Sequence, residues 1–365
     1  MTDLAHTTAP DWVSPPGDTI LDRLEELGWS QKELAERLGY TTKHVSQLLN
    51  GKAALTEDTA LRLEHTLGSR ARFWLEREAQ YREAIARRQE LDALAAQKSW
   101  LTALPLSDML KFGWLRRCSH KGQQVAECLN FFGVATIDAW RERYAEYGAA
   151  FRASAAFEKD GPAVGAWLRQ AERLACEIDC KPFNKAAFKA ALAEARTLTR
   201  ETDPAAFVPR LVETCRVAGV AVVLVPAPRG CPVSGAAQWL GTERAMIALS
   251  LRHKSNDHLW FSFFHEAGHI ALHSKKMQFV DVTKGFDGEY EDEADAFAMD
   301  SLIPGGAAPE LKTLPVSEDS IRWFADEIGI APGIVLGRMQ KEGLVPWKTH
   351  LNSLKVRYQW HHEAA

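Results

Sequence analysis

The chain lacks an excess of positive charge, and it lacks any apolar run long enough to cross a membrane. Its 365 residues include 44 Lys and Arg against 48 Asp and Glu, a formal charge of -4. The chain as a whole therefore has no general attraction to nucleic acid or acidic membranes. The longest apolar run, VAGVAVVLV from Val217, is far too short to span a bilayer and predicts a buried strand instead.

Paired cysteines are also lacking. The six cysteines include no CxxC pair, and no signal peptide is recognisable. We therefore expect reduced thiols in a cytoplasmic protein without membrane contact. The composition, 46% hydrophobic and 25% charged residues, is that of an ordinary globular protein. A chain of this length predicts two or three domains.

The N-terminal third of the sequence predicts a flexible arm followed by a helical domain. Residues 1–17 are rich in Pro, Ser and Thr and predict the arm. Asp18 is the expected N-cap of the first helix, and helical segments with Ser, Thr and Gly boundaries follow it. A longer helical stretch from about Ser69 to Gln97 connects this region to the rest of the chain. We expect one five-helix domain over residues 18–97.

The remainder of the chain predicts helices and then a mixed region. Residues 98–205 are helical in pattern, with loops expected at Gly113, Gly133, Gly148 and Gly161-Pro162. Strand-like runs at Gly219–Val225 and Trp239–Leu251 mark a change to α/β character. We place a third region at residues 206–310, and a C-terminal helical segment with a tail at residues 311–365.

Residues 265–269 read HEAGH, within the segment DHLWFSFFHEAGHIALH. On a helix, positions i and i+4 lie one above the other, so His265 and His269 can hold one metal ion. Glu266 would then lie beside the metal, where it can take a proton from water. Such residues suit zinc, although manganese or iron could also bind. We predict Zn²⁺ as the cofactor and Glu266 as the catalytic base.

A third protein ligand is expected from the acidic segment EYEDEADAFAMDSLIP. The helix that it predicts has an apolar face centred on Ala294. At 100° per residue, Glu291 lies nearer that face than Glu293, which points toward the opposite side. A carboxylate on a buried face needs a partner, and a metal ion is a strong one. Asp295 could accept a hydrogen bond from a ligand histidine and orient it. The alternative is a solvated acidic helix face.

His273 extends the histidine spacing by one more helical turn. It lies roughly 12 Å along the helix axis from His265, at the α-helical rise per residue. Because that distance is too long for both side chains to reach one ion on a straight helix, we expect His273 to be structural or to line a polar site.

The segment SQKELAERLGYTTKHVSQLLNG predicts two short capped helices joined by a turn at Gly39, as in a DNA-binding helix-turn-helix. Gln31 is placed for a phosphate contact. Residues 28–56 carry four basic and two acidic side chains, a thin positive charge that a homodimer would double. The alternative is a protein-interaction module without DNA binding. The second helix would present four side chains to the major groove of double-stranded DNA: Thr42, Lys43, His44 and Gln47.

Two parts of the sequence resemble known families. PGDTILDRLEELGWSQKELAERLGYTTKHVSQLLNG and the residues after it, to about residue 80, resemble the HigA-type antitoxin branch of the Xre helix-turn-helix regulators. WFSFFHEAGHIALH with EYEDEADAFAMDSLIP resembles the ImmA/IrrE family of zinc metallopeptidases, over about residues 215–305. The second resemblance implies a gluzincin-like domain in which His265, His269 and the acidic helix hold zinc. It also implies Glu266 as base and helix-turn-helix repressors as substrates.

We therefore expect a mostly α protein with a five-helix helix-turn-helix domain and a small α+β zincin-like metallopeptidase domain. Its expected function is that of a DNA-binding regulator with a zinc endopeptidase domain. The substrate would be a regulatory protein, either a repressor, a toxin–antitoxin partner or the chain itself, in a stress or phage and mobile-element response. Self-cleavage at about residues 69–97 would release the DNA reader. The alternative is a non-catalytic antitoxin-like transcription factor whose zinc domain is structural or senses a ligand.

Overall fold

The computed structural model describes residues 14–150, 155–273, 279–282 and 288–360. Within these residues the chain is mostly helical and contains a four-stranded sheet, which confirms the expected fold class. The chain divides into two compact units, Met1–Lys98 with Ser119–Ala126 and Ser99–Cys118 with Glu127–Ala365. In the described part of the chain, no helix combines the length and the apolar character that crossing a membrane requires. All six cysteines lie in that part, and there none of them forms a disulfide bond.

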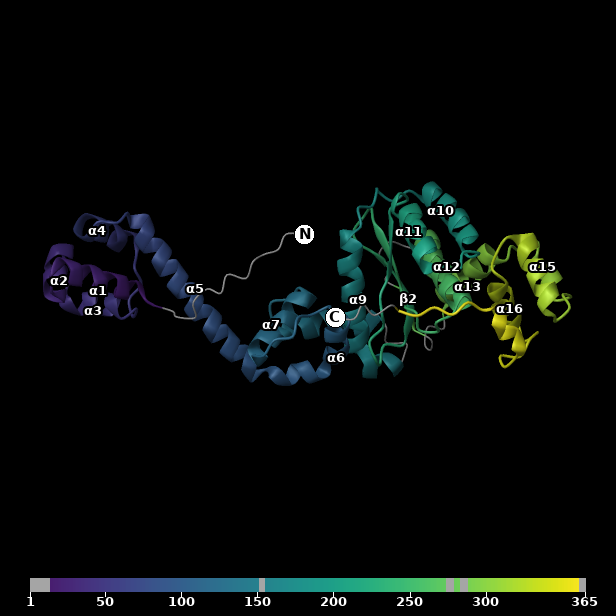
Figure 1. Ribbon diagram of the computed structural model, residues 1–365, viewed down its shortest axis with the longest axis horizontal. Coiled ribbons are helices and arrows are strands. Elements are labelled where there is room, and N and C mark those ends of the chain that lie inside the picture. Colours follow the sequence, from purple (N-terminus) through teal and green to yellow (C-terminus); the bar gives the residue numbers. More distant parts are fainter. Residues whose placement is uncertain (1–13, 151–154, 274–278, 283–287, 361–365) are drawn as a thin grey trace. The chain divides into compact units, whose positions relative to one another are not determined.

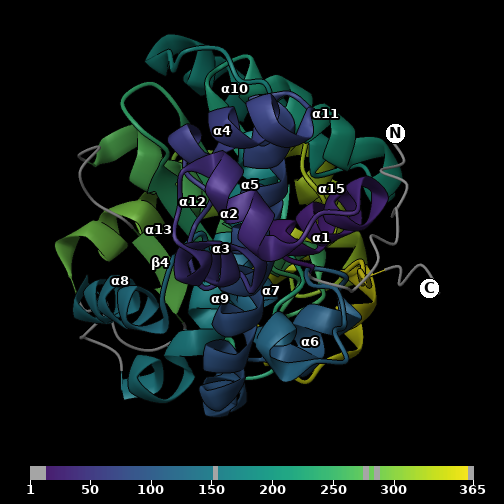
Figure 2. The same cartoon turned by 90° about the vertical axis from the view of Figure 1, so that its left-hand side faces the viewer.

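The first unit contains the five predicted helices. Helices α1 to α4 gather at one end of the long helix α5 (Figures 1 and 2). Their apolar faces meet in one core, in which Leu34, Val45 and Trp74 are each at most 1% exposed. The helices have the following bounds: α1 Pro16–Leu27, α2 Gln31–Leu38, α3 Thr42–Leu49, α4 Glu57–Leu67 and α5 Ala71–Ala96.

Local capping explains where α2 begins and ends and where α3 begins. Ser30 Oγ accepts a hydrogen bond from the Glu33 amide at 3.1 Å, and Thr41 Oγ1 accepts one from the His44 amide at 3.2 Å. Gly39 ends α2 in the left-handed region with φ 69°, where glycine has no Cβ penalty. These boundaries agree with the sequence prediction.

The start of α1 differs from the prediction. The helix begins at Pro16 with Pro15 as its N-cap, so Asp18 lies in the first turn and is not the cap. Proline is favourable at the first helical position because its missing amide hydrogen has no intrahelical acceptor there. The expected arm therefore ends earlier than residue 17, and its residues 1–13 lie outside the described residues.

Residues 98–150 and 155–216 form a further series of helices, in agreement with the helical pattern expected for residues 98–205. Gly113 and Gly133 lie between helices with positive φ, as predicted. The expected loops at Gly148 and at Gly161-Pro162 are wrong, because α8 and α9 continue through them. Beyond Pro162, α9 buries side chains that include Trp167, and this packing offsets the lost backbone hydrogen bond. The bounds are η1 Lys98–Ala103, α6 Leu106–Lys111, α7 Lys121–Phe132, α8 Ile137–Ala150, α9 Ala155–Glu177, α10 Lys185–Leu198 and α11 Pro204–Arg216.

The sheet has the strand order β1-β3-β2-β4. Strand β3 runs parallel to β1 and antiparallel to β2, and β4 pairs antiparallel with β2. Strands β1 and β3 lie in the two runs predicted as strands, whereas β2 and β4 were not predicted. The β2 sequence VSGAAQW is rich in small residues with low β propensity. The bounds are β1 Val220–Leu224, β2 Val233–Trp239, β3 Ala245–Leu249 and β4 Phe279–Val282.

Helices cover both faces of the sheet. Helix α9 lies along one face, and α10 to α13 lie on the other (Figure 1). Helices α12 (Asn256–Leu272) and α13 (Glu289–Leu302) run side by side. Alternate residues of β1, Val220 and Val222, join the large core that contains Phe263 of α12. The sheet therefore packs against α12, mainly through β2 and β3.

The C-terminal segment returns to the start of α12. After α14 (Ala308–Leu311), α15 (Glu318–Ile328), α16 (Pro332–Lys341) and η2 (His350–Leu354), the chain runs back past the domain, in yellow in Figure 1. Ser255 and Arg357 form a β-bridge. Lys355 Nζ lies 2.6 Å from Asp257 Oδ2, and both side chains are at most 8% exposed. The tail thus fixes the first turn of the helix that carries HEAGH.

Candidate functional site

Helix α12 is buried almost all around. Thirteen of its 17 residues are buried, including His265, Glu266 and His269. Because buried polar groups need partners inside the protein, the groups that surround these side chains decide which chemistry they can perform. The neighbours are α13, which supplies acidic side chains, and strand β2.

Two histidines of α12 and one glutamate of α13 converge. His265 Nε2 lies 3.1 Å from His269 Nε2 and 3.1 Å from Glu291 Oε2, and His269 Nε2 lies 3.5 Å from Glu291 Oε1. One potential ligand atom from each residue lies within 4.8 Å of the others. Two imidazole nitrogens and a carboxylate in a buried place are a donor set that suits zinc. The residues present therefore fit this metal.

The protonation states near neutral pH also fit a metal ion. Burial raises the pKa of Glu291, but its hydrogen bonds with His265 and His269 outweigh burial and hold that pKa at about 2. Burial lowers the pKa of His269. A metal ligand must be an ionised carboxylate or a neutral imidazole, and both shifts favour those forms.

Each of the two converging histidines has a different partner on its second ring nitrogen. His265 Nδ1 lies 2.9 Å from Asp295 Oδ1, the contact expected from the sequence. His269 Nδ1 lies 3.0 Å from His273 Nδ1, and His273 Nε2 lies 3.0 Å from Glu293 Oε2. Glu293 is 49% exposed, in line with its expected place away from the buried face, and its carboxylate still contacts His273. It reaches His273 because the last turn of α12 lies beside α13.

A glycine allows α12 and α13 to approach closely. A Cβ atom on Gly268 would lie 3.2 Å from the Ala294 Cα atom and 3.2 Å from Phe297 Cδ1. Such contacts are tighter than ordinary van der Waals distances, so a side chain at position 268 would push the helices apart. Gly268 sets the helix separation at which Glu291 reaches the histidines. This role of Gly268 was not predicted from the sequence.

A second glycine leaves space for the carboxylate of Glu266. Glu266 is 0% exposed, and a Cβ atom on Gly235 of β2 would lie 2.5 Å from its Oε1 atom. The role of Gly235 was not predicted, because β2 was not predicted either. Glycine inside a strand signals close approach of another group, but this signal is readable only once the strand is recognised.

The proposed DNA-contacting residues lie mostly on one exposed face. Gln31, Thr42, Lys43 and Gln47 are exposed. His44 is half-buried, and its ring packs edge-on against Tyr40 with centroids 4.7 Å apart. The buried side of α3 consists of Val45, Leu48 and Leu49.

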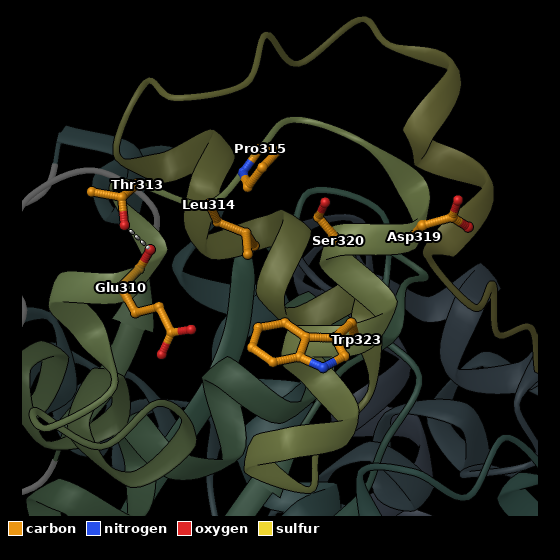
Figure 3. A pocket seen from close by; sticks show the side chains of 7 residues that line it. All are labelled: Glu310, Thr313, Leu314, Pro315, Asp319, Ser320 and Trp323. Atoms are coloured by element: carbon orange, nitrogen blue, oxygen red, sulfur yellow. Dashed lines mark hydrogen bonds between the residues drawn. The ribbon is translucent and has the colours of Figure 1, made fainter.

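A separate hollow of about 380 Å³ lies at α14, α15 and the loop between them (Figure 3). It includes the exposed ring of Trp323 and the carboxylate of Glu310, but no residue of the histidine cluster. Its lining residues are Glu310, Thr313, Leu314, Pro315, Asp319, Ser320 and Trp323.

Comparisons with known proteins identify both parts of the chain. Residues 20–74 match the helix-turn-helix family model, and residues 232–326 match the IrrE N-terminal-like domain, a peptidase family model. The uncharacterized HTH-type transcriptional regulator YddM of Escherichia coli (strain K12) is 42% identical over 60 residues, which span 16% of this chain and 64% of that protein. A solved addiction module antidote protein of the HigA family from Coxiella burnetii is 31% identical and has a TM-score of 0.22, covering 22% of this chain and 90% of its own. A helix-turn-helix domain and an IrrE-like domain thus lie in one chain.

Proposed function

We propose that this protein is a cytoplasmic DNA-binding regulator whose IrrE-like domain is a zinc endopeptidase that cuts a regulatory protein. One observation carries the proposal: His265, His269 and Glu291 converge on one another, and the residue after His265 on the same helix, Glu266, is buried. The helix-turn-helix domain in the same chain supports regulated cleavage over general digestion. The substrate would be a repressor, a toxin–antitoxin partner or the chain itself.

In this proposal His265, His269 and Glu291 hold the zinc ion. When bound, zinc supplies a Lewis acid that activates water and polarises a peptide carbonyl. Glu266 accepts a proton from water and passes it to the leaving amine. The absence of a side chain on Gly235 leaves the space that the Glu266 carboxylate occupies, which fixes its position for this transfer. Asp295 orients the ring of His265.

The exposed face of α3 is the proposed DNA reader. Gln47 can pair with adenine, and Lys43 with guanine or phosphate, in the major groove. Gln31, Thr42 and His44 would support these contacts. The small positive charge of the two helices supports a homodimer on a double-stranded operator, because two copies double the phosphate contacts.

Helix α5 is a candidate for self-cleavage. Between residues 79 and 93 it has no buried residue, and ion pairs one turn apart, such as Arg87 with Glu83, support it locally. Such pairs contribute only about 0.3–0.5 kcal/mol each, so this segment can unfold more readily than the packed helices. Cleavage there would separate the DNA reader from the rest of the chain.

The decisive experiment compares zinc-loaded full-length wild type with Glu266→Gln. Zinc content should be the same, because Glu266 is not a proposed ligand, while cleavage of candidate repressors, toxin partners or the chain itself should be lost. Intact-mass spectrometry would identify the products, including a self-cleavage product that ends between residues 79 and 93. If wild type cleaves none of these under any stress trigger, the peptidase proposal is wrong.

A matched pair of glycine variants makes this test specific. Gly235→Ala should displace the Glu266 carboxylate and reduce cleavage at least tenfold without removing zinc. Gly306→Ala is the control, because nothing lies within 4 Å of the added Cβ atom. Equal activity of both variants would show that the position of Glu266 does not matter for cleavage.

The complete burial of Glu266 favours one second candidate, a zinc domain that is structural or ligand-sensing. In that case Glu266→Gln leaves transcriptional regulation in cells unchanged, while Glu291→Gln alters it through loss of the metal. A reporter gene placed behind the protein's own operator would distinguish the two functions.

A further inference from the structure

A cavity of about 720 Å³ lies in the second unit, away from the histidine cluster. It is formed by α6, the loop after β1, the loop between β3 and α12, and the C-terminal segment. Its volume lies within the range of roughly 300–1,000 Å³ that is usual for small-molecule sites. The side chains that matter most are Lys111, Phe112, Arg229, Arg252, Lys254 and Trp360.

Positive charge gathers around this cavity although the chain as a whole is acidic. Four of its lining residues are Lys or Arg, and Asp108 is its only acidic residue. Asp108 is 8% exposed, and its Oδ2 atom accepts hydrogen bonds from the Arg229 amide at 2.8 Å and from Arg229 Nε at 3.3 Å. The single acidic group is therefore engaged by one cation, which leaves the cavity strongly positive. Cations held around one concave space favour an anionic ligand.

The loop that presents two of these cations has an unusual backbone. Lys254 has φ 55° and is one of two non-glycine residues in the described ranges with positive φ. Hydrogen bonds hold it there, from the Lys254 amide to Leu251 O at 3.2 Å and from the Tyr358 amide to Lys254 O at 2.9 Å. Arg252 donates to the carbonyl of Pro232. Strained residues that the surrounding structure holds in place are concentrated at functional sites.

Flat and apolar surfaces complete the lining. Phe112 and Trp360 are half-buried, and Pro226 and Pro228 lie beside them. Aromatic side chains next to cations are the pattern that binds a flat heterocyclic ring together with phosphate groups. An acidic peptide would satisfy the cations but would not use the two rings.

We propose that this cavity binds a nucleotide, with Lys111, Arg252 and Lys254 contacting the phosphates and Trp360 contacting the base. The site adjoins the helix that carries HEAGH, because Lys254 lies two residues before α12. The proposal does not depend on zinc binding or peptidase activity, since no residue of the histidine cluster lines the cavity.

Equilibrium dialysis of the full-length chain with ATP and Mg²⁺ tests this proposal, with adenosine and pyrophosphate as fragments. ATP should bind at least tenfold more tightly than either fragment, because each fragment makes only half of the contacts. Lys111→Gln with Lys254→Asn should weaken ATP binding at least tenfold through the loss of charged hydrogen bonds. Asn is chosen because it tolerates positive φ. Lys348→Gln, an exposed residue outside the cavity, is the matched control and should bind ATP as wild type does.

Trp360→Leu separates base recognition from simple anion binding. It should weaken ATP binding several-fold and leave pyrophosphate binding unchanged, with circular dichroism showing that the fold is retained. The proposal is overturned if wild type does not bind millimolar ATP, or if Lys348→Gln loses as much affinity as the double variant. Pyrophosphate binding as tight as ATP would show a plain anion site. Tighter binding of a single-stranded oligonucleotide would show a nucleic-acid groove, which also contradicts the proposal.

Discussion

The helix-turn-helix and the histidine helix carry their chemistry in opposite environments. On α3, Thr42, Lys43 and Gln47 are exposed, and the helix needs only its cap and its apolar face to present them. On α12, His265 and Glu266 are buried, and the polar groups around His265 come from α13 and from the next turn of α12. The difference teaches that a substitution on α3 should alter binding alone, whereas one on α12 should alter binding and stability together.

The largest effect is expected at Glu291. Glu291→Gln removes the carboxylate that reaches both histidines, so zinc affinity should fall by more than about 100-fold. Competition with a chromogenic chelator measures this, and operator binding should be unchanged. Glu289→Gln is the control, because Glu289 is exposed on the same helix. Retention of tight zinc by Glu291→Gln would contradict the proposed ligand set.

The second largest effect on zinc affinity is expected at the acidic side chains that contact the histidines without being proposed ligands. Asp295→Asn should lower zinc affinity by about 10–100-fold, since the carboxylate orients His265. Glu293→Gln should lower it less, because Glu293 acts on His269 only through His273 and is 49% exposed. The same chelator assay ranks the two variants. The reverse order would show that the His269 side of the cluster is the more important one.

A smaller effect is expected on the exposed face of α3. Gln47→Ala should cost about 1–3 kcal/mol of discrimination at one base pair. Lys43→Ala should weaken binding to all sequences and reduce the salt slope by about one. Fluorescence anisotropy with operator and scrambled DNA at several salt concentrations measures both. Lys312→Ala in the second unit should change neither value, and thermal stability should be the same in all three variants.

The smallest effect concerns pH. Burial lowers the pKa of His253, His258 and His269, so the unfolded chain binds more protons than the folded chain as pH falls below about 6.5. The metal-free protein should therefore be stable at pH 7 to 8 and lose stability progressively below that value. Urea unfolding at pH 7.5 and 5.5 measures the loss, which His258→Gln should reduce. A stability that rises on acidification would contradict these shifts.

The sequence could predict features that depend on neighbouring residues or on helical periodicity. Local residues determine three helix boundaries. Ser30 caps the start of α2, Gly39 ends α2, and Thr41 caps the start of α3. Glu291 was chosen over Glu293 from helical periodicity, and the structure places Glu291 at the histidines. The role of Glu291 as a metal ligand is part of the proposed function.

The sequence could not predict features that depend on distant packing. Strand β2 has small residues and no strong pattern, so the space that Gly235 leaves for Glu266 has no local signal. The contact between Glu293 and His273 was not predicted, because it depends on how closely α13 approaches α12. Helix α9 continues past Pro162 because its later residues pack against the sheet.

The buried pair of Lys355 and Asp257 makes the end of the chain a poor place for alteration. A chain shortened before Lys355 would keep the whole HEAGH helix but leave the carboxylate of Asp257 buried without its cation, at a cost of about 3–5 kcal/mol. Affinity tags and fusion partners are therefore better attached ahead of Pro16. Natural variation in this tail is expected to be tightly limited at Lys355, although the residue lies almost 90 positions from the histidines in the sequence.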